Sequence, residues 1–190
     1  GISCINLEIK NTERKSCVVS RSFGKRVENL QELREAIVGY CLNASEKIRS
    51  DSLVTKSITI FIRTSPFQNR YGFYSNSKTI DLPMATNNSI EIVKAAISGL
   101  ETIFKNGYQY QKAGVILSKL SDSINGKNLF SSEKDEKINN LMKSIDNTNY
   151  RYGRSTLSLA SAGVHKNCNM KRNYSSKIDT ADFYSLPIIK

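Results

Sequence analysis

The feature that most constrains the fold is a change of hydrophobic period within the first third of the chain. Between Leu30 and Ile48, apolar residues recur every three or four positions, which is typical of one face of an amphipathic helix. Shortly afterwards, Ile58, Ile60 and Ile62 alternate with other residues, which indicates a strand with one buried face. The helix stripe and the strand face must both be covered, so the pattern predicts a layered α+β fold.

The same two periods recur over residues 16–120. We expect strands at Ser16–Phe23, Ser57–Arg63, Phe73–Leu82 and Ala113–Leu117, and helices at Asn29–Ile48 and Asn88–Phe104. Pro83 is expected to close the third strand, because proline donates no hydrogen bond to a sheet. The order predicts a split βαβ (βαββαβ, ferredoxin-like) arrangement: a four-stranded sheet with two helices on one face.

The ends of the chain are more polar than this central part. Residues 1–15 are expected to form the end of a preceding element and a tether, and residues 121–136 a polar linker. Beyond the linker, residues 137–190 are expected to form a small C-terminal extension with irregular structure. In it we predict one helix at Lys137–Asn149 and a strand at Thr156–Ala160.

The net charge of +11 favours a polyanionic partner such as nucleic acid. No apolar run approaches the roughly 18 residues that a membrane-spanning helix needs, so we expect no membrane partner and a cytoplasmic location. Cys4, Cys17, Cys41 and Cys168 show no metal-ligand spacing, and the single histidine, His165, adds only one potential ligand near Cys168. We therefore expect no metal site and no cofactor in this chain.

The sequence also lacks the groupings that catalysis requires. Asp81 and Asp122 stand alone, whereas metal-dependent phosphoryl transfer needs clustered carboxylates. No serine or cysteine has a credible histidine base, and there is no glycine-rich phosphate loop. These observations predict a module without catalytic residues.

Hydroxyl groups and cations recur on the predicted strands. Such groups are the usual contacts to nucleic-acid phosphates, and they can share the sheet face opposite the helices. This pattern predicts shape-and-charge binding to a duplex backbone. The candidate DNA-binding residues are Ser20, Arg21, Ser22, Lys25, Arg26, Arg63, Thr64, Tyr74, Ser75, Asn76, Ser77, Tyr110 and Lys112.

The predicted linker contains an isolated apolar pair. Asn128, Leu129 and Phe130 form a candidate peptide for docking into an apolar pocket of a partner protein. The alternative is that Leu129 and Phe130 fold back onto their own domain.

Several segments, in order along nearly the whole chain, resemble the UmuC family, the catalytic subunits of bacterial DNA polymerase V. These are Y-family translesion DNA polymerases. The resemblance is carried by Ser20–Gly24, Leu33–Ile37, Ala44–Arg49, Phe61–Phe67, Tyr74–Ser77, Gly107–Val115, Leu141–Met142 with Asp146, Asn149–Leu157 and Met170–Arg172.

The resemblance implies that this chain corresponds to particular domains of a longer protein. Residues 1–15 would end the thumb, residues 16–120 would be the little finger that lies along template–primer DNA, and residues 137–190 the C-terminal region. The catalytic palm with its Mg²⁺ would lie outside this chain, and the family acts in error-prone synthesis during the SOS response. By the same resemblance, the linker would carry a sliding-clamp peptide, and further partners would be an UmuD-type subunit and a recombinase filament. Gly126 and Lys127 stand where that peptide usually has glutamine and a hydrophobic residue.

Two other functions remain open from the residues alone. The chain could be a protein-interaction module that docks such partners without touching DNA. A ferredoxin-like sheet could also bind single-stranded RNA by stacking bases on Phe61, Phe73 and Tyr74.

Overall fold

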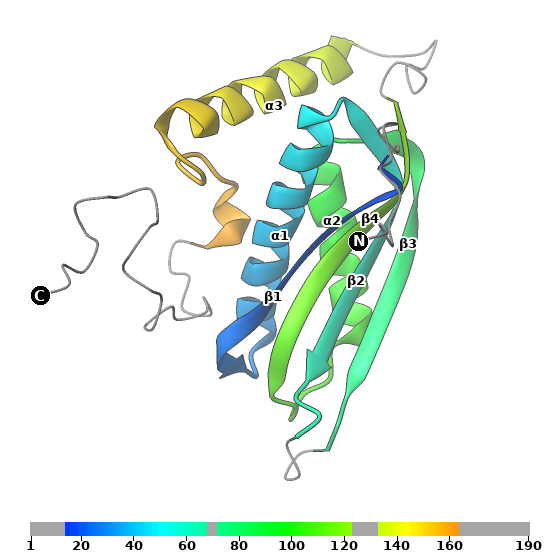
Figure 1. The fold of residues 1–190 in the computed structure, drawn as a ribbon, viewed down its shortest axis with the longest axis vertical. Helices are drawn as coiled ribbons and strands as arrows, with labels where there is room; N and C mark the ends of the chain where they lie inside the picture. Colours follow the sequence, from blue (N-terminus) through cyan, green and yellow to red (C-terminus); the bar gives the residue numbers. More distant parts are fainter. Residues whose placement is uncertain (1–13, 68–71, 123–132, 164–190) are drawn as a thin grey trace, which may run out of the picture.

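The computed structural model describes residues 14–67, 72–122 and 133–163. A four-stranded sheet carries two helices on one face, and a third helix crosses the C-terminal half of the first (Figure 1). The elements in chain order are β1 (Ser16–Val27), α1 (Leu30–Ser50), β2 (Leu53–Thr64), β3 (Ser75–Thr86), α2 (Ser89–Ile103), β4 (Tyr110–Asp122), α3 (Glu133–Tyr152) and a 3-10 turn at Ala160–Ala162. No helix in these ranges is both long and apolar enough to cross a membrane.

The strand order is β1-β4-β2-β3, and every neighbouring pair is antiparallel. Helix α1 joins β1 to β2, which lie on either side of β4. Helix α2 joins β3 to β4, which lie on either side of β2. Each helix therefore connects two parallel strands with an antiparallel strand between them, so the predicted split βαβ fold is confirmed.

The core lies between the sheet and helices α1 and α2. The predicted alternation in β2 is confirmed, because Ile58, Ile60 and Ile62 are all fully buried against the helices. Cys17 and Cys41 belong to the same core, and burial raises the pKa of both thiols above the ordinary value. They therefore behave as small hydrophobic residues rather than as reactive thiolates.

Both core helices begin at the predicted asparagine. The Asn29 side-chain oxygen accepts a hydrogen bond from the Gln31 amide at 2.9 Å. The Asn88 side-chain oxygen accepts one from the Ile90 amide at 3.0 Å, and its nitrogen donates to Glu91. These bonds satisfy amide groups that have no partner within the helix.

Two sequence expectations about strands are wrong. Pro83 does not close β3, which continues to Thr86 past an irregularity in its pairing with β2. Proline is tolerated there because β3 is an edge strand and its outer amides need no partner. Residues 156–160 form no strand, because the Asn149 side chain bonds both the amide and the carbonyl group of Leu157 at 2.8 and 2.9 Å.

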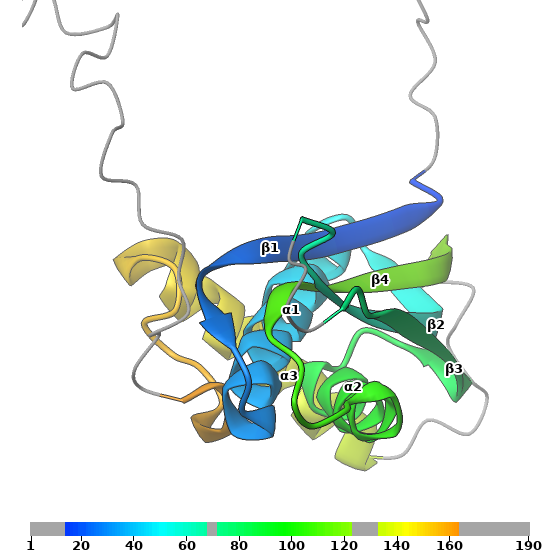
Figure 2. The same ribbon diagram turned by 90° about the horizontal axis from the view of Figure 1, so that it is seen from below.

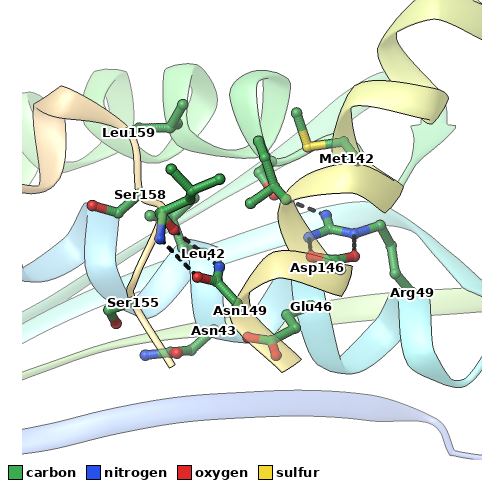
Figure 3. A pocket seen from close by; sticks show the side chains of 13 residues that line it. Leu42, Asn43, Glu46, Arg49, Met142, Asp146, Asn149, Ser155, Ser158 and Leu159 are labelled. Atoms are coloured by element: carbon green, nitrogen blue, oxygen red, sulfur yellow. Dashed lines mark hydrogen bonds and ion pairs between the residues drawn. The ribbon is translucent and has the colours of Figure 1, made fainter. Parts of the chain in front are cut away.

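Arg49 on α1 bonds the C-terminal extension to the core domain (Figure 3). Ala162 of the extension is also buried in the hydrophobic core. The Arg49 guanidinium on α1 donates two hydrogen bonds to the Asp146 carboxylate on α3, at 2.7 and 2.8 Å. It also donates to the Asn87 carbonyl at 2.7 Å and to the Ser89 hydroxyl at 2.8 Å, just before and at the start of α2. The Arg49 side chain is only 11% exposed, so water screens these bonds weakly.

We predict that Asp146→Ala loosens α3 from the core domain by about 1–3 kcal/mol, because a largely buried guanidinium loses its charged partner. Hydrogen exchange of the α3 amides should accelerate while exchange in the sheet stays unchanged. Glu101→Ala is the control: it removes the partner of Arg34 from an exposed ion pair, for which the expected effect is below about 1 kcal/mol. Unchanged α3 protection in Asp146→Ala would show that other contacts hold the extension.

Candidate nucleic-acid interface

The sheet face opposite the helices is covered by no element of the described ranges (Figure 2). We call it the open face. Because side chains alternate along each strand, the register places every second residue there. Across β1, β4, β2 and β3 in turn, its four rows are Ser22, Lys112, Arg63, Ser75; Ser20, Gly114, Phe61, Ser77; Val18, Ile116, Thr59, Thr79; and Ser16, Ser118, Ser57, Asp81.

The row through Arg63 and Lys112 is cationic. These two residues face each other on the central strands, with Ser22 and Ser75 at the two edges of the sheet. Among the described side chains of residues 14–67, 72–122 and 136–163, no carboxylate forms an ion pair with either cation. By contrast, Arg14, Arg34, Arg49 and Lys119, which lie away from this row, each form an ion pair with a carboxylate. The row therefore offers two adjacent, unneutralised positive charges flanked by hydroxyl groups.

The positive charge continues into an irregularity of the first strand. Residues 23–26 of β1 lie between the pairs Ser22–Lys112 and Val27–Tyr110, where only one residue of β4 lies opposite them. Lys25 and Arg26 in this segment are exposed. Together with Gln111 they line a small polar hollow next to the cationic row. This bulge adds two further cations at the same end of the open face.

The opposite end of the open face carries an ion pair. The Lys119 ammonium lies 3.0 Å from both carboxylate oxygens of Asp81. Its hydrogen bonds lower the pKa of Asp81, so the carboxylate stays ionised near neutral pH and offsets the lysine. The two adjacent cations without a carboxylate partner, Arg63 and Lys112, thus lie at the end of the open face nearer the β2–β3 hairpin.

An aromatic ring lies between these two ends. A methyl group placed on Gly114 would come within 2.5 Å of the Phe61 ring and of the Ser20 side chain. The ring therefore lies against the bare backbone of β4. This contact has no local signature in the sequence, because Phe61 and Gly114 meet only through the register of β2 with β4.

Not all predicted DNA-binding residues lie on this surface. The structure brings together Ser20, Ser22, Arg63, Ser75, Ser77 and Lys112, with Lys25 and Arg26 beside them. Arg21 and Asn76 are exposed but occupy positions in register with the buried residues Ala113 and Ile62, so they belong to the helix side.

Three predicted contacts belong to the core domain's own structure. Tyr110 is fully buried, and its hydroxyl accepts from the Lys105 amide and donates to the Lys105 carbonyl. The Tyr74 hydroxyl donates to the Ile103 carbonyl at 2.6 Å. Thr64 is buried, and its hydroxyl accepts from the Tyr74 amide at 2.8 Å. We exclude these three side chains from the interface.

The described ranges contain no group of three histidine, cysteine or carboxylate side chains that could hold a metal ion. The hollow between α1 and α3 contains Glu46 and Asp146, and Asp146 is engaged by Arg49 (Figure 3). The candidate clamp-binding residues Asn128, Leu129 and Phe130 lie outside the described ranges.

Comparison with protein families gives two matches. A model described as the impB/mucB/samB family C-terminal domain matches residues 14–129, and a domain of unknown function (DUF4113) matches residues 139–189. The chain belongs to the impB/mucB/samB family. The predicted resemblance to UmuC is confirmed.

Protein MucB of Salmonella typhimurium is 36% identical over 189 residues, covering 99% of this chain and 45% of that protein. Protein UmuC of Salmonella typhimurium (strain LT2) is 34% identical over 192 residues, covering 100% of this chain and 46% of that protein.

The chain thus spans less than half the length of these family members. Among solved structures, it is similar to the chain in an insertion ternary complex of Dbh DNA polymerase, at a TM-score of 0.45 and 11% identity. That similarity covers 60% of this chain and 31% of the other.

We predict that Gly114→Ala destabilises the protein by about 1–3 kcal/mol, because the added methyl group displaces the Phe61 ring or the Ser20 side chain. Urea denaturation would measure the loss. Gly39→Ala is the matched control: nothing lies within 4 Å of its added methyl group in α1, so a gain of about 0.5–1 kcal/mol is expected. A Gly114→Ala protein as stable as the wild type would contradict the close contact.

Proposed function

We propose that this chain is the non-catalytic, DNA-gripping C-terminal part of an error-prone translesion DNA polymerase. In this proposal the open face lies against the sugar–phosphate backbone of the template–primer duplex. The observation that carries it is the pair of cations without a carboxylate partner, Arg63 and Lys112, flanked by the hydroxyl groups of Ser22 and Ser75 in one row of the open face. Membership of the family that contains UmuC supports the polymerase assignment.

The chemistry of the open face suits a backbone better than base edges. Arg63 presents a guanidinium that can donate two hydrogen bonds to one phosphate, and Lys112 adds a point charge beside it. Ser20, Ser22 and Ser75 provide hydroxyl donors around them. None of these groups is placed by a rigid recognition helix, so the expected binding depends on shape and charge rather than on sequence.

The polymerase reaction itself would belong to another part of the parent protein. The palm, with its carboxylates and Mg²⁺, would lie outside this chain, and the open face would hold the duplex product in register with it. Recruitment of accessory proteins, such as a sliding clamp, an UmuD-type subunit or a recombinase filament, would be a second task. We assign that task to residues 121–190.

We predict that replacing Arg63 and Lys112 together with alanine weakens duplex DNA binding at least tenfold, equally for unrelated sequences. Each cation that contacts a phosphate contributes about 0.9 to the slope of log affinity against log salt, so the slope should fall by about 2. Fluorescence anisotropy with a labelled duplex over a range of salt concentrations measures both quantities.

Arg21→Ala is the matched control for this experiment. Arg21 is an exposed arginine one residue away from Ser22 on β1, but its register with Ala113 places it on the helix side. Its removal lowers the net charge without changing the open face, so affinity should change less than threefold. Equal losses in Arg21→Ala and in the double variant would indicate a general charge effect and contradict a contact through the open face.

A further inference from the structure

The C-terminal end of α3 and the turn after it expose an uncommon combination of side chains. Tyr150 and Tyr152 are 93% and 69% exposed, whereas the other described tyrosines (Tyr40, Tyr74, Tyr108 and Tyr110) are partly or fully buried. Arg151 lies between the two exposed tyrosines and Arg154 follows them, and both arginines are exposed. We call residues 150–154 the Tyr–Arg turn.

The Tyr–Arg turn is held in a defined shape. Gly153, with φ of 106°, ends the helix, and its amide donates to the Asn149 carbonyl at 3.1 Å. The Thr156 hydroxyl donates to the Gly153 carbonyl at 2.8 Å. The Asn149 side chain fixes both backbone groups of Leu157 on the far side of the turn. The exposed rings therefore project from an ordered, hydrogen-bonded support.

The charge of the Tyr–Arg turn is not neutralised locally. Residues 147–163 contain no aspartate or glutamate. Within the described ranges no ion pair involves Arg151 or Arg154, and Asp146, the nearest carboxylate along the chain, is bound to Arg49. The turn thus combines two solvent-facing aromatic rings with two free guanidinium groups.

We propose that the Tyr–Arg turn is a binding site for single-stranded nucleic acid. Proteins bind single strands by stacking bases on exposed aromatic side chains and by placing cations along the backbone. The turn has both kinds of group within five consecutive residues. Nothing in the match of residues 139–189 to a domain of unknown function assigns this role.

The geometry favours a single strand over a protein surface. Tyr150 and Tyr152 are two residues apart at a helix end, so their side chains leave the helix about 160° apart and form no common flat patch. Successive bases of a flexible strand can reach such separated rings one by one. The arginines then match the charge of the phosphates between the bases.

The site is separate from the open face. Figures 1 and 2 both place the C-terminal end of α3 on the side of the molecule away from β3. Binding of single strands by the turn is therefore independent of duplex binding by the sheet. Substitutions at Tyr150 and Tyr152 test the first, and substitutions at Arg63 and Lys112 test the second.

The test is an anisotropy titration of the 190-residue chain with a fluorescein-labelled oligothymidylate of about 20 nucleotides, longer than common single-strand site sizes. Replacing Tyr150 and Tyr152 together with alanine should weaken binding at least tenfold, and replacing both with phenylalanine should leave it within threefold of the wild type. Duplex binding by the alanine variant should be unchanged. An unchanged far-UV circular dichroism spectrum and thermal unfolding midpoint confirm that each variant is folded.

The arginines are tested by salt dependence. Replacing Arg151 and Arg154 together with alanine should lower the slope of log affinity against log salt by about 1.4, at about 0.7 for each single-strand phosphate. Lys143→Ala removes an exposed cation elsewhere on α3 and should leave the slope unchanged.

Two results would overturn the site. One is oligothymidylate affinity that is unchanged in the double tyrosine-to-alanine variant, which would leave the turn as a protein-contact surface. The other is an equal loss in the alanine and phenylalanine variants, which would exclude stacking. Either result leaves the proposal for the open face intact, because that proposal depends on Arg63 and Lys112.

Discussion

The antiparallel pairing of β2 with β4 at the centre of the sheet is the constraint on which both the core and the candidate interface depend. The register pairs Ile60 with Val115 and Phe61 with Gly114. Neighbouring residues of a strand point to opposite faces, so one alignment buries the first pair under the helices and places the second pair on the open face. A slip of one residue along the strand would move the core side chains to the open face and the open-face side chains into the core. Loss of the hydrophobic core strongly disfavours this slip. Packing of the hydrophobic core therefore determines which side chains lie on the open face.

The cations of the protein fall into two groups with different physical roles. Arg49 is largely shielded from water and forms directional bonds between three segments, so its charge is used within the structure. Arg63 and Lys112 lie at an exposed end of the sheet, where an added carboxylate partner would contribute little to stability. Leaving them unpaired costs the fold little, and their two positive charges are part of the net charge of +11 that attracts a polyanion.

The type and order of the core elements were predictable, because hydrophobic period and helix capping are local properties of the sequence. The stripe in α1, the alternation in β2 and the caps Asn29 and Asn88 all act over a few residues. The interface was only partly predictable. Whether a polar strand residue such as Tyr110 faces the solvent or the core depends on the bulge opposite it, and bulges follow from pairing between distant strands. The pairing of Arg49 with Asp146, 97 residues apart, has no local signature either.

The extension is oriented by polar contacts more than by a core of its own. Among the described side chains after residue 135, only Met142 and Ala162 are buried. A guanidinium that bonds a carboxylate in bidentate geometry fixes direction as well as distance, so Arg49 sets how α3 lies relative to the sheet. The open face and the Tyr–Arg turn are thereby held at a constant separation.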